Sequence, residues 1–218
     1  MLQTFCLLSL LIAGPQANTP EKRSSDARAT FIQAQQHLTA RDYAAAERGF
    51  REVIKLDPQS AAAYSDLGVV YMGTNRVTSA IRSFEAAGKL APSEIGIDLN
   101  LGLAYYRKHL FEQAIPHFKR VLIANPRNGQ ARYLEGLCYF ALRDYKNAAE
   151  TLAPLSAQEK DNLDFLFVEG ISYGKLNQKA ESQKAFDQMV RIGGAFRPDA
   201  SAAGQILYRL LLQSTGPR

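Results

Sequence analysis

Residues 61–94 read AAAYSDLGVVYMGTNRVTSAIRSFEAAGKLAPSE, and this stretch determines the fold. In its first half, apolar and small residues recur three or four positions apart, which is the spacing of one face of an α-helix. They are Tyr64, Leu67, Gly68 and Tyr71. The second half repeats this spacing with Ala80, Phe84 and Ala87, and Pro92 then ends the helical pattern. The stretch therefore predicts two amphipathic helices joined by a short turn.

The same pattern recurs every 34 residues along the chain. Prolines keep this interval at Pro58, Pro92 and Pro126. A bulky apolar series runs through Phe50, Phe84, Phe118, Leu152 and Phe186. A series of small residues comprises Ala34, Gly68, Gly102, Gly136 and Gly170. An aromatic series comprises His37, Tyr71, Tyr105, Tyr139 and Tyr173. We expect the small residues to let the two helices of each unit approach closely, with the aromatic rings filling the space between them.

These units resemble the tetratricopeptide repeat, a family of 34-residue helix-turn-helix units with the pattern W-x2-L-G-x2-Y, A-x3-F and P. The second and third units match best, although Asp98 replaces the usual aromatic in the third. The first, fourth and fifth units depart more, for example at Glu135, Glu169 and Ser182. The resemblance covers residues 27 to about 194. It implies an all-α fold, a right-handed α-solenoid, in which the first helices of the units line a concave groove.

The 34-residue interval sets the expected boundaries of the units and their helices. The predicted units are 27–60, 61–94, 95–128, 129–162 and 163–194. First helices are expected near 27–40, 61–74, 95–108, 129–142 and 162–175. Second helices are expected near 43–56, 77–90, 111–124, 145–155 and 178–192. A further helix near 198–213, within residues 195–218, is expected to cap the fifth unit.

The two ends of the chain carry predictions of their own. The apolar run from Phe5 to Ala13 is typical of a signal-peptide core and is too short to cross a membrane. We expect residues 1–17 to be a signal peptide, 18–26 to be a flexible polar segment, and the protein to be periplasmic or secreted. A cytoplasmic location is the alternative. Tyr208 and Leu212 form a second apolar stripe on the C-terminal helix, which favours a homodimer through that helix. The alternative is that this sequence is part of a longer chain.

Composition and motifs indicate neither catalysis nor nucleic-acid binding. The 218 residues carry a net charge of +5, and acids are interspersed among the bases, so no basic patch stands out. Cys6 and Cys138 are the only cysteines, which excludes a disulfide framework and a cysteine-based zinc site. We expect Cys138 to be a buried, inert thiol, and His37, His109 and His117 to be packing or surface residues. No catalytic or nucleotide-binding motif occurs, so we expect no enzyme activity, cofactor or metal.

The resemblance also indicates where a partner would bind. Some members of the family hold a C-terminal carboxylate with Lys and Asn in the first unit, but Phe31 and Gln35 occupy those positions here. Others use a ladder of Asn residues, of which only Asn100 is present. The groove positions of the third to fifth units are apolar instead. These predicted groove residues are Leu99, Leu103, Tyr106, Tyr133, Leu137, Phe140, Phe167 and Ile171. Such a stripe marks an interaction site if it is exposed; the alternative is that curvature of the array or the terminal segment buries it.

The sequence therefore predicts a non-enzymatic scaffold or adaptor that holds a peptide or helix of a partner protein in an apolar concave groove. Two alternatives stay open. One is a repeat module of an enzyme system, either part of a catalytic chain or a subunit that presents substrate. The other is a related helical repeat that binds single-stranded RNA, which the apolar groove positions disfavour. The identity of the partner does not follow from the sequence.

Overall fold

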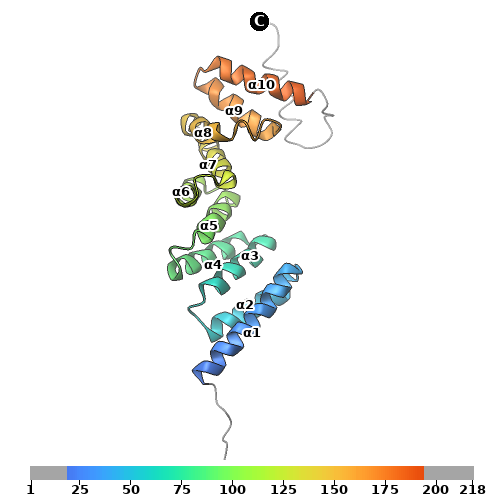
Figure 1. Cartoon of the computed structure of the whole chain (residues 1–218), viewed down its shortest axis with the longest axis vertical. Helices are drawn as coiled ribbons and strands as arrows, with labels where there is room; N and C mark the ends of the chain where they lie inside the picture. Colours follow the sequence, from blue (N-terminus) through green and yellow to red (C-terminus); the bar gives the residue numbers. More distant parts are fainter. Residues whose placement is uncertain (1–18, 194–218) are drawn as a thin grey trace, which may run out of the picture.

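The computed structural model describes residues 19–193, which form a row of ten α-helices and one short 3-10 helix, η1 (Figure 1). The first six helices are α1 (Pro20–Thr39), α2 (Tyr43–Leu56), α3 (Ala61–Gly73), α4 (Val77–Leu90), α5 (Ile95–Arg107) and α6 (Phe111–Ala124). The remaining elements are α7 (Gly129–Ala141), α8 (Tyr145–Leu152), η1 (Ala153–Leu155), α9 (Leu163–Lys175) and α10 (Lys179–Gly193). None of these helices is both long and apolar enough to cross a membrane.

Two predictions fall on residues that the structure does not describe. The signal peptide expected at 1–17 lies before the first described residue. The capping helix expected at 195–218, with the stripe of Tyr208 and Leu212 predicted to form a homodimer, lies after the last one. Both stay predictions.

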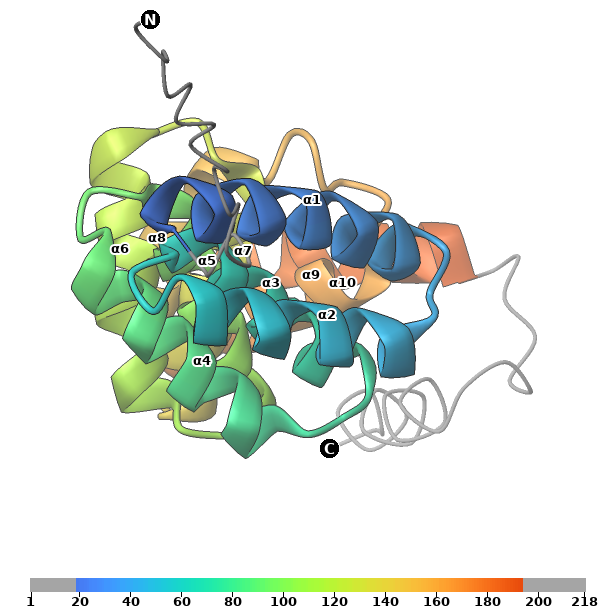
Figure 2. The same ribbon diagram turned by 90° about the horizontal axis from the view of Figure 1, so that it is seen from below.

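Consecutive helices pair, and the pairs stack into an elongated array (Figure 1). Each odd-numbered helix packs against the even-numbered helix that follows it, and each even-numbered helix packs against the next odd-numbered one. Consecutive odd-numbered helices also contact each other, from α1 through α9. Figure 2 looks along the array from its N-terminal end, with α1 and α2 nearest the viewer. The architecture is an α-solenoid of five helix pairs, and the odd-numbered helices line its inner, concave side.

Local sequence explains where the helices begin and how the chain reverses between them. Six helices follow a residue whose side chain accepts a hydrogen bond from a backbone N–H of the first turn: Thr19, Asp42, Ser60, Asn128, Asp144 and Asn162. Five turn residues, again 34 positions apart, have left-handed backbone with φ of 58–61°: Arg41, Asn75, His109, Arg143 and Asn177. Asn75 and Asn177 confirm the expectation from sequence, because Asn adopts this conformation more readily than most residues.

The core of the array is the contact between the small-residue series and the bulky series. A Cβ atom placed on Gly68 would lie 2.4 Å from Cε1 of Phe84, which is far inside van der Waals contact. Gly102 meets Phe118, Gly136 meets Leu152 and Gly170 meets Phe186 in the same way. Four alanines on the second helices are 0% exposed: Ala46, Ala80, Ala114 and Ala148. The helices of each pair therefore cross where the sequence predicts, and the crossing has no room for a larger side chain.

The segment 18–26, which we expect from sequence to be flexible and polar, is mostly helical, and that prediction is wrong. Helix α1 begins at Pro20 instead of near residue 27. Thr19 accepts a hydrogen bond from the N–H of Lys22, which satisfies one unpaired donor of the first turn. Pro20 stands where its missing N–H has no helical partner to lose, and Glu21 interacts favourably with the positive end of the helix dipole.

The second helix of the fourth unit is also shorter than expected. The prediction extends it to residue 155, but α8 ends at Leu152 and η1 follows over Ala153–Leu155. Pro154 explains the change, because a proline nitrogen cannot donate the hydrogen bond that would continue the α-helix.

Candidate functional site

All eight predicted groove residues lie on α5, α7 and α9, which are odd-numbered helices on the concave side. Each of the eight side chains is half-buried. The exposed large apolar side chains of residues 19–193 lie elsewhere: Ile32, Leu110, Ile123 and Val190. The structure thus places the predicted residues on one side of the array, but their side chains are more buried than those of an exposed stripe.

Six of the eight predicted residues pack against the buried core. Leu99 and Tyr106 contact the cluster around Phe118. Four others contact the cluster around Leu152 and Phe165: Tyr133, Leu137, Phe140 and Phe167. The ring centroids of Phe140 and Phe167 lie 6.4 Å apart, which links α7 to α9. Leu103 and Ile171 belong to none of the buried clusters found between residues 19 and 193, so the core uses these two side chains least.

Burial controls the ionisation of the groups on and beneath this surface. It raises the pKa of Tyr133 to about 12, and the charge of Asp164 adds to the effect. It also raises the pKa of Tyr106. Both phenols therefore stay protonated at neutral pH and can donate hydrogen bonds. The Cys138 thiol is 0% exposed, which confirms its predicted burial, and this burial raises its pKa to about 12.

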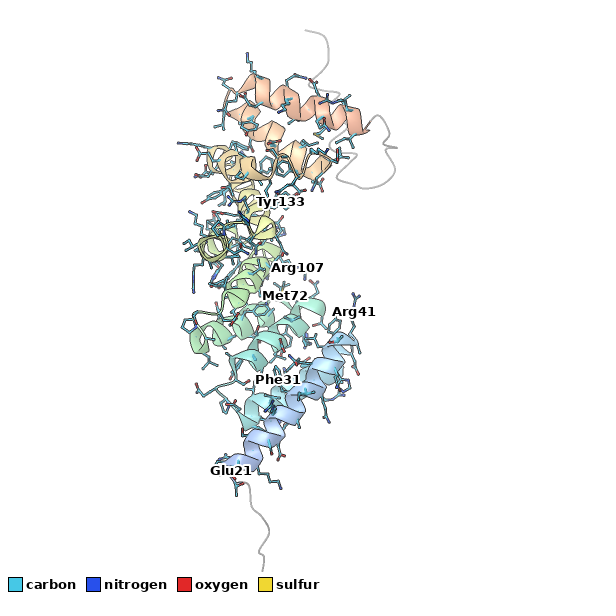
Figure 3. All side chains as sticks on the ribbon, in the orientation of Figure 1. Glu21, Phe31, Arg41, Met72, Arg107 and Tyr133 are labelled. Carbon is cyan, nitrogen blue, oxygen red and sulfur yellow. The ribbon has the colours of Figure 1, made fainter. Side chains whose placement is uncertain are left out.

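A pocket of about 470 Å³ opens on the concave side, between the C-terminal ends of α1, α3 and α5. Figure 3 labels Arg41, Met72 and Arg107, which come from these three segments and line the pocket. The apolar part of its wall includes Leu38, Val69, Met72 and Leu103. Of the predicted groove residues, only Leu103 lines it. The repeat register also places the other apolar residues at groove positions, because Val69 stands 34 residues before Leu103, and Leu38 and Met72 stand at the repeat position of Tyr106.

Polar side chains occupy the concave side of the first three helix pairs. Gln35 Nε2 donates a hydrogen bond to Asp66 Oδ2 at 3.2 Å, which joins α1 to α3. Burial raises the pKa of Asp66, and the hydrogen bond from Gln35 opposes this only in part. Asn100 of α5 lines the pocket beside them. The concave side is therefore mixed in character at its N-terminal half and apolar at its C-terminal half.

The buried carboxylate of Asp98 joins α5 to α6, a contact that no sequence pattern predicts. Asp98 is 3% exposed, and its Oδ1 lies 2.9 Å from Nδ1 of His117. Its Oδ2 lies 3.2 Å from Nη2 of Arg120, which also donates to the carbonyl of Pro92 at 2.7 Å. This cluster stands at the repeat position where the family pattern has an aromatic residue. Over residues 19–193, no group of three or more His, Cys, Asp or Glu residues is placed to hold a metal ion.

Comparison with known protein families identifies the fold family. The model of a family described as tetratricopeptide repeat matches residues 23–95 and 99–157. The chain belongs to the tetratricopeptide repeat family. This confirms the resemblance inferred from the 34-residue series, and with it the right-handed α-solenoid. Tetratricopeptide repeats are protein–protein interaction scaffolds, and that general role is the functional class of this chain.

Curated relatives contain related repeats within longer chains. Anaphase-promoting complex subunit 3 of Schizosaccharomyces pombe is 23% identical over 155 residues, which cover 71% of this chain and 23% of the relative. The chloroplastic tetratricopeptide repeat domain-containing protein PYG7 of Arabidopsis thaliana is 34% identical over 116 residues, which cover 50% of this chain and 38% of the relative. The chain thus spans well under half the length of either relative.

Solved structures share the fold. YrrB, reported as a TPR protein with an unusual peptide-binding site, matches with a TM-score of 0.74 and 19% identity, over 87% of this chain and 95% of YrrB. MamA matches with a TM-score of 0.69 and 21% identity, over 77% of this chain and 92% of MamA. At these identities the likeness concerns the fold alone, and it confirms the solenoid predicted from the sequence.

Proposed function

We propose that this tetratricopeptide repeat protein is a non-enzymatic adaptor whose concave side holds an extended or helical segment of a partner protein. The observation that supports this most directly is the set of apolar side chains on the odd-numbered helices, together with the pocket of about 470 Å³ between α1, α3 and α5. Leu103 and Ile171 are half-buried but belong to none of the described core clusters, so a partner can cover them without disturbing the core.

The half-burial of the other groove residues also suits binding. Tyr133, Phe140 and Phe167 are held by the core before any partner arrives, so little side-chain entropy is lost when a partner covers their exposed edges. Aromatic side chains held in this way are the type enriched at binding hot spots. The peptide-binding site reported for YrrB shows that a solenoid of this fold can take a peptide ligand.

A second candidate is a repeat unit within a larger assembly that contains an enzyme. The names of two relatives support membership of a larger assembly: one is a subunit of the anaphase-promoting complex, and another is a member of the BBSome complex. In that case the same concave side would contact another subunit of the assembly instead of a free peptide. The two candidates share the surface and differ in the occupant.

The test compares two double variants of the whole chain. Leu103→Gln with Ile171→Gln changes the concave side at the positions that the core uses least. Ile123→Gln with Val190→Gln is the matched control, because these apolar side chains are 82% and 62% exposed on the even-numbered helices α6 and α10. A random-peptide display library is selected on the parent, and the enriched peptides are then measured against both variants by isothermal titration.

We expect the enriched peptides to bind the control as they bind the parent, and to bind the concave variant at least about tenfold more weakly. Circular dichroism melting should show all three chains equally folded. Peptides that lose affinity on the control variant but not on the concave variant would contradict the proposal and place the binding surface on the even-numbered helices.

A further inference from the structure

The concave pocket is lined by two arginines that have no acidic partner among residues 19–193. Arg41 stands in the turn after α1, and Arg107 is the last residue of α5. Both line the pocket, and both are exposed. Arg107 Nη1 donates to the carbonyl oxygen of Met72 at 3.1 Å, which anchors this guanidinium beside the pocket. Within residues 19–193, neither guanidinium comes within 4.0 Å of a carboxylate oxygen, whereas Arg51, Arg76 and Arg120 each do.

The interior of the pocket is apolar and of a size suited to side chains. Leu38, Val69, Met72 and Leu103 supply its apolar wall, and all four are half-buried. The volume of about 470 Å³ falls in the range of pockets that hold small ligands or anchor side chains. A guanidinium prefers a planar carboxylate as its ionic partner, and two of them at one edge strengthen that preference. The pocket thus pairs an apolar interior with two positively charged side chains.

We infer that this pocket receives an apolar side chain of the partner segment, and that Arg41 and Arg107 bind the carboxylate of an Asp or Glu next to that side chain in the partner's sequence. The inference rests on the proposed function, since it specifies which segments the concave side accepts. The occupant is a protein segment with adjacent apolar and acidic residues. Charge complementarity at the pocket edge is the reason for this assignment.

Asp66 determines on which side of the apolar side chain the partner's acidic residue lies. It lies on α3 six residues before Met72, which corresponds to about 9 Å along the helix. Among residues 19–193, its carboxylate accepts a side-chain hydrogen bond only from the amide of Gln35. An acidic side chain placed toward Asp66 would meet a like charge, whereas one placed toward Arg41 and Arg107 meets two opposite charges. The acidic residue of the partner therefore lies on the turn side of its apolar neighbour.

The test uses the same display library with a variant of inverted charge. In such a library the C-terminus of each peptide is fused to the coat protein, so every selected carboxylate is a side chain. The variant is Arg41→Glu with Arg107→Glu, and Arg41→Glu alone serves if the loss of the Arg107 hydrogen bond lowers stability. The matched control is Arg82→Glu with Arg127→Glu, which changes the net charge equally at two exposed arginines outside the pocket.

We expect peptides selected on the parent to carry Asp or Glu beside a large apolar residue. Their affinity should fall at least about tenfold on the charge-inverted variant and stay unchanged on the control. Replacing the acidic residue of the peptide by Lys should restore binding to the inverted variant, which loss of folding could not produce. Raising the salt concentration should weaken the parent complex, because exposed charges are screened.

Each other outcome overturns the inference in a distinguishable way. If the peptides depend on Leu103 and Ile171 but not on Arg41 and Arg107, the concave side binds peptides and only the charge pairing is wrong. If the peptides depend on neither pair, the proposed function falls as well. If a labelled oligouridine binds the parent and is lost on the charge-inverted variant while no peptide is, the ligand of the two arginines is a nucleic acid.

Discussion

Two glycines on the same helix should respond in opposite directions to the same substitution. A Cβ atom on Gly102 would lie 2.6 Å from Cε1 and 2.9 Å from Cδ1 and Cζ of Phe118, whose side chain is 0% exposed and has nowhere to move. A Cβ atom on Gly96 would find only Oε1 of Glu94, at 3.6 Å, which is ordinary contact. Both glycines belong to α5, so the pair separates the effect of packing from the effect of helix formation.

The magnitudes follow from two opposing effects. Alanine favours a helix interior over glycine by about 0.5–1 kcal/mol, and Gly96, the second residue of α5, should show the lower end of this range. Overpacking a filled core costs about 1–3 kcal/mol, and this cost applies to Gly102 alone. Gly96→Ala should therefore raise the free energy of unfolding by about 0.5 kcal/mol. Gly102→Ala should lower it by about 1 kcal/mol.

Urea unfolding followed by circular dichroism measures both values. The same geometry ranks other positions, because the closest approach is 2.4 Å for Gly68, 2.6 Å for Gly102 and 2.9 Å for Gly170. We expect Gly68→Ala to be the most destabilising of these three variants and Gly170→Ala the least. If Gly102→Ala proves as stable as Gly96→Ala, the helix crossing is not as close as the structure has it, and the role assigned to the small-residue series is wrong.

Three further changes test the buried polar groups. Asp98→Ala should lower the free energy of unfolding by about 2 kcal/mol, because it removes the charged partner of His117 and Arg120. A double-mutant cycle with His117→Ala should show a coupling free energy of about 1 kcal/mol, and additive effects would contradict the pairing. Asp66→Asn should stabilise the chain more at about pH 7 than at about pH 3. Burial raises the pKa of Asp66, so the folded parent binds the proton more tightly than the unfolded parent, and the stability of the parent falls as the pH rises. An equal effect of the substitution at both pH values in urea unfolding would refute this. Cys138 should resist iodoacetamide at about pH 8.5 in the folded chain and react after unfolding, because burial raises its pKa to about 12; rapid native modification seen by peptide mass spectrometry would contradict it.

The 34-residue series predicted the helices best where the structure repeats. Helices α2, α4 and α6 begin and end at the expected residues, 43–56, 77–90 and 111–124. The start of α1 and the end of α8 were missed because each depends on a local feature outside the series. Thr19 and Pro20 form a helix-start signal that no other unit has, and Pro154 interrupts only the fourth unit.

The repeat register predicts on which helices the proposed groove residues lie, but it does not predict how far they are exposed. Leu99, Leu103 and Tyr106 share one face of α5, yet Leu99 and Tyr106 pack against the core while Leu103 does not. This difference depends on the curvature of the array and on the bulk of side chains from neighbouring helices, which a repeat register does not encode. The contact of Asp98 with His117 is also hidden from the register, because it joins two residues 19 positions apart that belong to none of the series.

In the aromatic series the tyrosine is constant in the second, third and fourth units, while the side chain that it contacts on the preceding unit changes. Tyr71 accepts a hydrogen bond from Arg51 Nη2 at 3.0 Å and donates one to Glu47 Oε1 at 3.3 Å, whereas Tyr105 donates one to Glu85 Oε1 at 2.7 Å. Arg51 and Glu85 stand 34 residues apart, at the same place on the second helix of the preceding unit. A phenol serves both because its oxygen can donate and accept. Burial and the carboxylate of Glu85 raise the pKa of Tyr105 to about 12, which keeps the donor in place.

The next member of the series extends the argument to a third kind of partner. Lys119 occupies the same place in the third unit, and its Nζ lies 5.6 Å from the centroid of the Tyr139 ring, where the face of the ring attracts a cation. Arg, Glu and Lys can therefore alternate on one side of the contact only because the other side stays tyrosine. Helix α1 has no described helix pair before it. In this helix the aromatic series has His37, which is exposed. Its Nδ1 lies 3.5 Å from Oδ2 of Asp42, the residue before α2. Tyr71, Tyr105 and Tyr139 thus each contact the second helix of the preceding unit.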